Sequence, residues 1–377
     1  MDQLSIGIMG RSQKPNERRL AVHPSHLAHI PDDLRSRVFL EEGFGADFGA
    51  SADELSQYVG GFRSHQELIA ECDVILQPKP LIGDVTELRD GQVLWGWPHC
   101  VQDERLTQAA IDKKLTLIAF EAMNHWNSDG SFGLHVFHKN NELAGYCSVL
   151  HALQLCGFTG AYGPGRTAVV IGFGATARGA ITALRSMGIH DVDVLTRRDP
   201  PAVANPIPAV RLVEWDSDGD GQALTEDGPV PLRDFLTGHD IIVNCILQNT
   251  DSPEIFLTEA DLPALAPGSL IVDVSCDEGM GFTWAKPTSF NDPTFVVGDN
   301  VTYYAVDHSP SFLWNSSTWE ISSALLPFLP TVLGGPDTWQ ADPTIQRSIE
   351  IREGVIQNPA ILSFQGRAAE FPHRRAD

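Results

Sequence analysis

The chain has no long hydrophobic run, and none of its apolar stretches approaches the roughly 18 residues that a membrane-spanning helix needs. Its first residues, MDQLSIGIMG, contain no basic segment followed by an apolar one, unlike a secretory signal. The six cysteines form no C-x-x-C pair, and several lie in apolar runs. These absences predict a cytoplasmic protein with reduced thiols, no structural zinc and no membrane partner.

Positive charge is also scarce, because 26 Lys and Arg residues face 49 Asp and Glu residues, for a formal net charge of −23. A strongly acidic surface repels phosphate backbones, so we expect no nucleic-acid partner. The acidic stretch DSDGDGQALTED, at 216–227, begins like a calcium loop. Its twelfth residue is Asp227 where Glu is usual, and good flanking helices are missing. We therefore interpret it as an acidic surface hairpin or loop and expect no bound metal.

The 377 residues have no internal repeat and suit two hydrophobic cores. Strand-like segments at 1–10, 71–80, 93–100 and 115–123 end in polar loops, and helical patterns lie between them. A second alternation of this kind runs from 168 to 306. Such alternation is typical of mostly parallel sheets. The sequence predicts an α/β fold with two Rossmann-like domains.

Two segments with apolar residues at helical spacing, 138–158 and 316–335, divide the chain. We expect both to be long helices that link the domains. A further helix is expected at TIQRSIEIREGVIQ, 344–357. The predicted partition is a discontinuous outer domain, at 1–140 and 320–377, with an inserted inner domain at 141–319.

The segment AVVIGFGATARGAI, at 168–181, is a strand, a glycine-rich turn and a helix start. Gly172 allows the tight turn, Gly174 lets the backbone approach a pyrophosphate, and Ala177 takes the position that packs the helix. The N–H groups at the start of the helix then face the anion. The flanking strand and helix favour dinucleotide binding over a merely structural turn.

The strand VDVLT, at 192–196, ends where an acidic residue would hold a ribose 2′-hydroxyl, about twenty residues after the glycine turn. Thr196, Arg197 and Arg198 stand there instead. A guanidinium suits a 2′-phosphate through its charge and its forked donors. The inserted domain is therefore predicted to bind NADP(H).

Several ordered motifs span nearly the whole chain. They are PNERRLAVHP (15–24), QPKP (77–80), GWPHC (96–100), GFGATARGA (172–180), SLIVDVSCDEGMGFTWAKPT (269–288) and YYAVDHSPS (303–311). Together they resemble the alanine dehydrogenase and saccharopine dehydrogenase superfamily, and within it most of all the N5-(carboxyethyl)ornithine synthases. The third loop glycine of alanine dehydrogenases is absent, and so is their NAD-selecting acidic residue. Both departures favour the synthase branch.

The resemblance implies that pyruvate condenses with the side-chain amine of ornithine or lysine, and that NADPH reduces the imine. By the same resemblance, Arg19 binds the keto acid carboxylate, which a guanidinium does with two parallel hydrogen bonds. Lys79 contacts the keto acid and transfers protons, and His99 is a general acid or base. Asp277 is a third catalytic candidate, near the nicotinamide and the substrate.

The remaining assignments also follow from the resemblance. Glu17 and Glu121 would hold a substrate ammonium group, while Asp307 and His308 would lie against the substrate or the nicotinamide. The expected cofactor contacts are Gly172, Gly174, Ala175, Thr176, Ala177, Arg178, Thr196, Arg197, Arg198, Cys245, Ile246, Leu247, Val274 and His308. Partners would be a small keto acid and an amino acid, and relatives of this kind indicate a homo-oligomer.

Three other interpretations stay open. An alanine dehydrogenase would use ammonia, but the arginines after the second strand argue against its usual NAD. A saccharopine-type enzyme would join 2-oxoglutarate to lysine, and the motifs fit it less well. A non-catalytic NADP(H)-binding sensor would not need Lys79 and His99, because a sensor transfers no protons.

Overall fold

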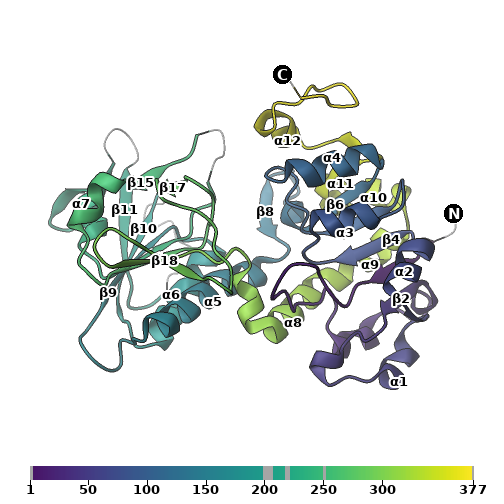
Figure 1. The fold of residues 1–377 in the computed structure, drawn as a ribbon, viewed down its shortest axis with the longest axis horizontal. Helices are drawn as coiled ribbons and strands as arrows, with labels where there is room; N and C mark the ends of the chain where they lie inside the picture. Colours follow the sequence, from purple (N-terminus) through teal and green to yellow (C-terminus); the bar gives the residue numbers. More distant parts are fainter. Residues whose placement is uncertain (1–2, 198–206, 217–220, 249–251, 376–377) are drawn as a thin grey trace. The chain divides into compact units, whose positions relative to one another are not determined.

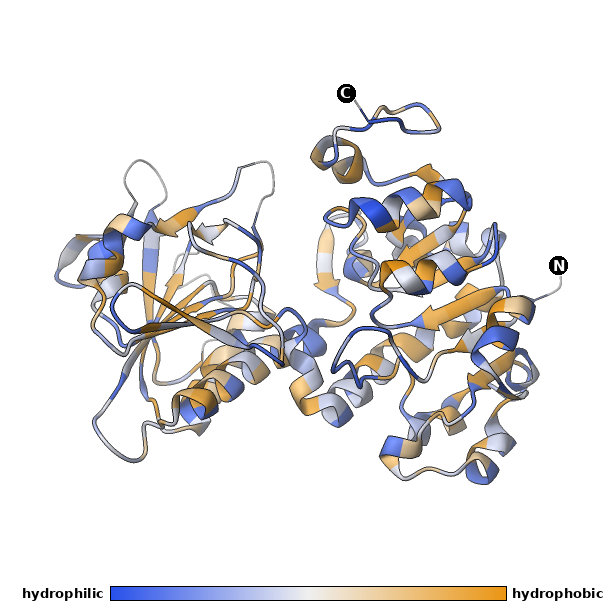
Figure 2. Ribbon diagram, in the orientation of Figure 1, coloured by the Kyte–Doolittle hydropathy of each residue, from blue (hydrophilic) through white to orange (hydrophobic). Residues whose placement is uncertain are grey.

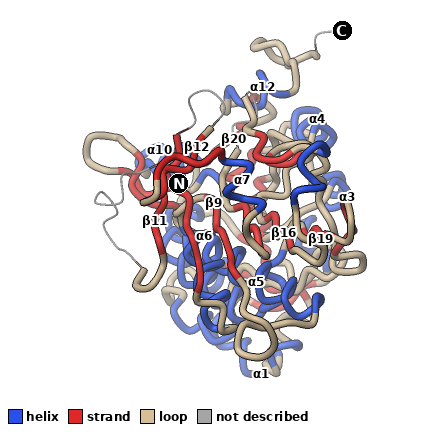
Figure 3. The backbone as a smooth tube through the Cα atoms, turned by 90° about the vertical axis from the view of Figure 1, so that its left-hand side faces the viewer, coloured by secondary structure: helices blue, strands red, loops and turns tan. Residues whose placement is uncertain are grey.

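The computed structural model describes residues 3–197, 207–216, 221–248 and 252–375 (Figure 1). The chain divides into two compact units. Unit 1 contains Met1–His138 and Trp314–Asp377, and unit 2 contains Lys139–Leu313. Along the chain, strands and helices alternate in both units (Figure 3). The expected α/β architecture with Rossmann-like sheets is confirmed.

The sheet of unit 1 has a doubly wound core. In spatial order its strands are β3 (Gly61–Arg63), β2 (Val38–Glu41), β1 (Ile6–Ile8), β4 (Val74–Gln77), β5 (Val93–Gly96), β6 (Thr116–Ala119), β20 (Ile349–Arg352) and β21 (Val355–Ile356). The strands from β3 to β6 are parallel, and β20 and β21 add an antiparallel hairpin. The order 3-2-1-4-5-6 is that of a Rossmann fold, with the direction of winding reversing between β1 and β4.

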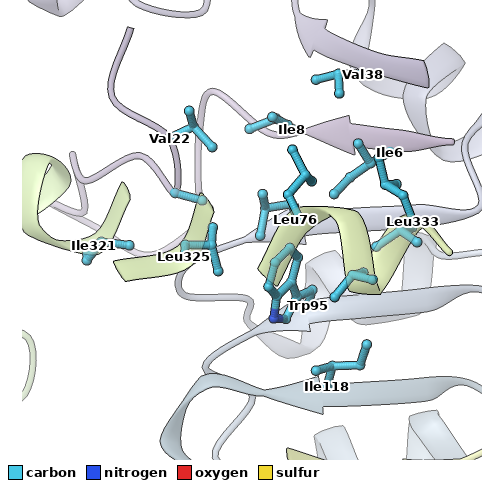
Figure 4. Close-up of a cluster of buried hydrophobic side chains, with 14 of the residues drawn as sticks. Ile6, Ile8, Val22, Val38, Leu76, Trp95, Ile118, Ile321, Leu325 and Leu333 are labelled. Carbon is cyan, nitrogen blue, oxygen red and sulfur yellow. The ribbon is translucent and has the colours of Figure 1, made fainter. Parts of the chain in front are cut away.

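The central strands of unit 1 are mostly hydrophobic and buried along their whole length, because helices cover both faces of the sheet (Figure 2). On one face lie α2 (His65–Glu71), α3 (Ile82–Glu87) and α4 (Glu104–Asp112). On the other lie α8 (Trp314–Leu325) and α9 (Leu329–Leu333). Figure 4 shows Leu325 and Leu333 of these helices packed near Leu76 and Trp95 of the strands. The C-terminal part of the chain thus completes the core that the N-terminal part begins.

Short elements complete unit 1. They are α1 (Ala52–Leu55), the hairpin β7 (Asn124–Trp126) and β8 (Phe132–His135), and the helices α10 (Pro336–Ala341), α11 (Pro343–Ser348) and α12 (Pro359–Phe364). The 3-10 turn Phe120–Ala122 follows β6 directly and carries Glu121.

The sheet of unit 2 repeats the same winding. Its parallel strands, in spatial order, are β11 (Arg211–Asp216), β10 (Asp191–Thr196), β9 (Thr167–Ile171), β14 (Ile241–Asn244), β16 (Leu270–Asp273) and β19 (Val301–Tyr304). The antiparallel strands β12 (Gln222–Thr225), β13 (Gly228–Pro231) and β18 (Thr294–Val297) extend its edges, and β15 (Ile255–Leu257) pairs with β17 (Gly281–Phe282). The winding reverses between β9 and β14, where open α/β sheets bind ligands.

Helices cover both faces of this sheet as well. One face carries α5 (His138–Cys156) and α6 (Ala175–Ser186), and the other carries α7 (Leu232–Thr237). The helices α5 and α6 cross at very close range, because a Cβ at Gly179 would lie 1.7 Å from the carbonyl oxygen of Glu142. This crossing fixes α6, and with it the glycine-rich turn that precedes it.

Most expected elements are present, with two corrections. The helix expected at 138–158 is α5, but the one expected at 316–335 is broken after Leu325, since Pro327 and Pro330 remove backbone donors. The prediction of one helix at 344–357 is wrong, because α11 ends at Ser348 and the β20–β21 hairpin follows. The alternation in IEIR and the left-handed turn at Glu353 and Gly354 favour the hairpin.

The acidic stretch at 216–227 begins at the last residue of β11 and contains β12, the first strand of the β12–β13 hairpin, and its residues 217–220 lie outside the described ranges. Within those ranges, no group of three or more His, Cys, Asp or Glu residues could hold a metal ion. No helix in the described part of the chain is long and apolar enough to cross a membrane.

Candidate active site

In unit 1 the candidate side chains follow neighbouring strands at the same edge of the sheet. Lys79 comes after β4, His99 after β5 and Glu121 after β6. Arg19 lies on the segment after β1, which pairs with β4. Because these strands are parallel, their carboxyl ends meet at one edge, where doubly wound sheets bind ligands.

Lys79 and His99 form a direct pair, with Nζ of the lysine 2.6 Å from Nε2 of the histidine. A lysine ammonium has only donors, so Nε2 of His99 must be unprotonated when it accepts from a charged Lys79. The contact therefore cannot form with both groups charged. The hydroxyl of Ser12 donates to the carbonyl oxygen of Lys79 at 2.7 Å and fixes the loop. This arrangement can take up and deliver protons.

The backbone of His99 is in the left-handed region, with φ of 49°, which non-glycine residues seldom adopt. The backbone N–H of His99 donates to Oε1 of Glu121 at 2.7 Å, and the same oxygen lies 3.8 Å from Nδ1 of the ring. Strained conformations of this kind gather at functional sites, where surrounding contacts hold them. Glu121 thus holds the backbone of His99 in this conformation.

Glu121 has a buried neighbour that the sequence did not indicate. Glu350 lies on β20, where the pairing with β6 shifts register between Ile349 and Ile351. Its Oε1 accepts from Asn358 at 2.9 Å. Among the residues that the structure describes, Oε2 of Glu121 and Oε2 of Glu350 are buried without a hydrogen-bond partner. The only sequence signal was a glutamate inside the apolar run SIEI.

The Glu121 side chain is 25% exposed, but Oε2 of each glutamate is buried, and two carboxyl groups in such a place cannot both ionise easily. Burial, followed by the charge of Glu350, raises the pKa of Glu121 to about 8. Burial also raises the pKa of Glu350. The thiol of Cys100 lies in the same region, and its pKa is raised by burial and then by the charges of Glu350 and Glu121. At neutral pH the pair behind His99 therefore retains a proton.

Arg19 is held by Glu17 in a buried ion pair. Nε of Arg19 donates to one carboxylate oxygen at 2.9 Å and Nη2 donates to the other at 2.5 Å. The two side chains are 4% and 1% exposed. The guanidinium lies 5.5 Å from the ring of Trp97. Arg18, by contrast, is half exposed and reaches Asp47 at 3.4 Å.

In unit 2 the loop after β9 has the geometry of a phosphate-binding turn. Gly172 has φ of +101° and donates its N–H to the carbonyl oxygen of Leu195 at 2.8 Å. Gly174 caps α6, and a Cβ at Gly174 would meet nothing within 4 Å. The helix then starts with Ala175 and Thr176, and Ala177 is buried. The open space before a helix N-terminus fits a pyrophosphate.

The end of β10 forms part of a small cavity. Thr196 is buried, and the half-exposed guanidinium of Arg197 lies 4.6 Å from the ring of Trp215. Arg197 also forms an ion pair with Glu254. The cavity, of about 170 Å³, is lined by Gly172, Phe173, Gly174, Leu195, Thr196, Arg197, Trp215 and Ile246. Arg178, on α6, stacks on Phe173 at 4.5 Å, and Arg198 lies outside the described residues.

Further predicted residues of unit 2 follow β14, β16 and β19. The N–H of Cys245 donates to Ile171 at 3.0 Å and that of Val274 donates to Asn244 at 2.9 Å, so these loops are tied to the sheet. Ile246 lines the cavity, and Leu247 is 95% exposed.

The acidic residues here differ in their surroundings. Asp273 is fully buried and accepts from Tyr303 at 2.6 Å and Asn244 at 3.0 Å, which gives it a structural role. Asp277 is partly buried, and burial raises its pKa. Oδ1 of Asp307 lies 2.6 Å from Nδ1 of His308, whose ring is buried. Asp277 and the Asp307–His308 pair are thus the candidate functional groups of this edge.

Comparisons with known proteins agree with this architecture. Residues 9–142 match the "Alanine dehydrogenase/PNT, N-terminal domain" family and residues 152–359 match the "Alanine dehydrogenase/PNT, C-terminal domain" family. An alanine dehydrogenase of Halomonas elongata is 29% identical over 94% of this chain and 95% of its own. An N(5)-(carboxyethyl)ornithine synthase of Clostridium botulinum is 26% identical over 82% of this chain and 89% of its own.

A solved structure of an L-alanine dehydrogenase has the same fold, with a TM-score of 0.75 and 19% identity, over 96% of this chain and 99% of that one. Because the two family models together match most of the sequence, the chain belongs to the alanine dehydrogenase/PNT family of nicotinamide-dependent oxidoreductases.

Proposed function

We propose that this protein condenses pyruvate with the side-chain amine of ornithine or lysine and reduces the imine with NADPH, giving N5-(1-carboxyethyl)ornithine from ornithine. The observation that carries the proposal is the Lys79–His99 pair, 2.6 Å apart at the carboxyl ends of β4 and β5. A proton-transfer pair suits a reaction in which water is lost from a carbinolamine. The similarity to the Clostridium botulinum synthase supports the same choice.

Arg19 is proposed to bind the carboxylate of the keto acid. Its guanidinium carries five N–H donors, of which Glu17 accepts from Nε and Nη2. Glu17 therefore acts on the substrate through Arg19, by fixing the plane of the guanidinium. A fixed plane favours bidentate binding of a second carboxylate.

Lys79 and His99 are proposed to move the protons. The neutral amine attacks the carbonyl carbon, His99 takes the proton that the nitrogen loses, and Lys79 protonates the oxygen. His99 passes its proton to the same oxygen, which leaves as water while the nitrogen lone pair forms the protonated imine. The sum is keto acid plus amine plus the proton of Lys79, giving protonated imine plus water. Glu121 is proposed to position His99 rather than to hold the ammonium of the amino acid, because its Oε1 accepts from the backbone N–H of His99 and its raised pKa keeps it protonated at neutral pH.

Unit 2 is proposed to hold NADP(H). The backbone at Gly172 and Gly174 and the start of α6 would bind the pyrophosphate, while Thr196 and Arg197 would bind the 2′-phosphate. When bound, the nicotinamide supplies the hydride that reduces the imine. Asp277, Asp307 and His308 are the side chains of this unit that we propose to face it.

Alanine dehydrogenation, with ammonia as the amine and NAD(H) as the cofactor, is the second candidate. Two observations favour it. The Halomonas elongata relative is named an alanine dehydrogenase, and the carboxylate of Glu254 offsets the charge of Arg197.

The test follows NADPH absorbance with pyruvate and, in separate reactions, ornithine, lysine, ammonia or no amine. A parallel series uses NADH, and a further mixture contains 2-oxoglutarate and lysine. Oxidation of NADPH only with pyruvate and a diamino acid is the expected result. Activity with ammonia and NADH would establish the second candidate instead. No turnover with any mixture, despite tight nucleotide binding, would contradict both and favour a sensor.

A further inference from the structure

The arginine at the proposed 2′-phosphate site already has an acidic partner. Arg197 follows β10, and Glu254, 57 positions further along the chain, reaches its guanidinium as an ion pair. The two side chains are 48% and 31% exposed. The guanidinium carbon of Arg197 also lies 4.6 Å from the centre of the Trp215 ring. The guanidinium therefore contacts both a carboxylate and an aromatic ring at the wall of the cavity.

Glu254 is fixed by its own backbone. Its N–H donates to Oε1 of Gln248 at 3.0 Å, and its carbonyl oxygen accepts from the N–H of Gly281 at 2.8 Å. Within the ranges that the structure describes, Oε2 of Glu254 is buried without a hydrogen-bond partner. Burial of a carboxylate oxygen that accepts no hydrogen bond costs free energy. The backbone contacts of Glu254 and its ion pair with Arg197 therefore hold the carboxylate in this position.

A carboxylate in this position treats the two nicotinamide cofactors differently. A 2′-phosphate that approaches Arg197 meets the negative charge of Glu254, and like charges at close range repel. It must displace the carboxylate from the guanidinium or share the donors with it. A 2′-hydroxyl carries no charge and meets no such opposition.

We propose that Glu254 is a specificity-determining residue that lowers the preference of this protein for NADPH over NADH, by competing with the 2′-phosphate for Arg197. The inference rests on the proposed dinucleotide site and goes beyond it, because Glu254 belongs to none of the motifs that predict the cofactor. The proposed role of Glu254 also explains why the arginine at the proposed 2′-phosphate site forms an ion pair with a glutamate.

The experiment isolates the 2′-phosphate with two fragments, adenosine 2′,5′-bisphosphate and 5′-AMP. Their dissociation constants are measured by calorimetry for the unmodified protein and for Glu254→Gln. We expect the bisphosphate to bind about tenfold more tightly to the variant, as for a charge-assisted hydrogen bond gained, with 5′-AMP within about twofold. The ratio of NADPH to NADH affinity should rise by the same factor. The matched control is Glu214→Gln, which removes an equal charge from an exposed position on β11.

An unchanged ratio in Glu254→Gln would overturn the inference. So would weaker binding of 5′-AMP with unchanged binding of the bisphosphate, because Glu254 would then hold the ribose hydroxyl. Glu254→Asp, which keeps the charge but shortens its reach, should show a smaller gain and serves if the glutamine variant does not fold. Arg197→Gln tests the proposed cofactor separately. If Arg197→Gln binds the bisphosphate with normal affinity, the NADP(H) assignment fails. If Arg197→Gln loses affinity for the bisphosphate but Glu254→Gln has no effect, only the proposed role of Glu254 fails.

Discussion

Two arginines of this molecule, each paired with a glutamate, lie in very different surroundings. In unit 1, the Arg19 and Glu17 side chains are 4% and 1% exposed. In unit 2, those of Arg197 and Glu254 are 48% and 31% exposed. A buried pair is strongly destabilised when one partner is removed, because the other charge stays behind without water. A half-exposed pair contributes less to stability, so a ligand can replace one partner without unfolding the protein. The first pair therefore suits a fixed anchor, and the second suits a site where a ligand replaces a protein group.

The same contrast extends to the rest of each unit. The candidate site of unit 1 consists of side chains that hold one another, such as Lys79, His99 and Glu121. The site of unit 2 consists largely of backbone, with Gly172 and Gly174 at its centre. Substitutions at the candidate site of unit 1 should therefore act on chemistry or folding, and those at the glycine turn itself in unit 2 should act on nucleotide affinity.

The largest expected effect is on turnover. Replacing His99 with Gln or Lys79 with Met breaks the 2.6 Å pair. Since positioned acid–base groups contribute about 10²–10⁴-fold, kcat should fall by that factor. The dissociation constant for NADPH, measured by calorimetry, should not change. His125→Gln is the control, because His125 is an exposed histidine of the same unit. Equal losses of turnover and of nucleotide affinity would mean that the two units do not divide the work as proposed.

The second effect concerns the buried anchor. Glu17→Gln removes the buried carboxylate that accepts from Nε and Nη2 of Arg19, so the free energy of unfolding in urea should fall by about 3–5 kcal/mol. Asp47→Asn removes the exposed partner of Arg18, so the free energy of unfolding should change by less than about 1 kcal/mol. If both variants lose little, the burial of the Arg19 pair does not distinguish it from a surface pair.

Two glycines of one motif should separate binding from packing. Gly174→Ala adds a methyl group where nothing lies within 4 Å, so stability should stay within about 0.5 kcal/mol while NADPH binds at least about tenfold more weakly. Gly179→Ala would place its Cβ 1.7 Å from the backbone of Glu142 and should cost about 1–3 kcal/mol of stability. Urea unfolding and calorimetry measure the two quantities. Normal NADPH affinity in Gly174→Ala would argue against a pyrophosphate at this turn.

Candidate site residues could be predicted from the sequence where they lie in short motifs along the chain. The glycine turn and the polar residues after apolar strands are short motifs, and parallel strands bring such residues to one edge whatever the loops between them. Lys79 and His99 could therefore be paired from the sequence alone. The IEIR segment was misassigned because its flanking residues have helical spacing, while its pairing with β6 depends on a strand more than 200 residues earlier.

Glu350 and Glu254 could not be found in this way. Each reaches its partner through tertiary structure, Glu350 from the C-terminal hairpin toward Glu121 and Glu254 from the segment after β14 toward Arg197. No motif marks them: Glu254 is a single glutamate in a loop, and the only local signal for Glu350 is its place inside the apolar run SIEI. Only the packing of distant segments shows that Glu254 offsets the charge of Arg197 and that Glu350 raises the pKa of Glu121.

The smallest expected effect is a change of stability with pH, and it tests whether the buried carboxyl pair of unit 1 holds a proton. The folded-state pKa of Glu121 is about 8, above its ordinary value of 4.5, so the folded protein binds this proton more tightly than the unfolded chain. The resulting stability is complete below about pH 4.5 and is lost as the pH rises to about 8. Relative to Glu121→Gln, the unmodified protein should lose on the order of 1–2 kcal/mol between these limits, a fraction of the full linkage because Glu350 shares the site. Urea unfolding across this range measures the difference.

Glu350→Gln should move the loss of stability to lower pH, because it removes the charge that helps to keep Glu121 protonated. Glu353→Gln, at an exposed position of the same hairpin, should not move it. Parallel pH profiles for the unmodified protein and Glu121→Gln would show that the pair ionises normally and that the proton behind His99 is absent.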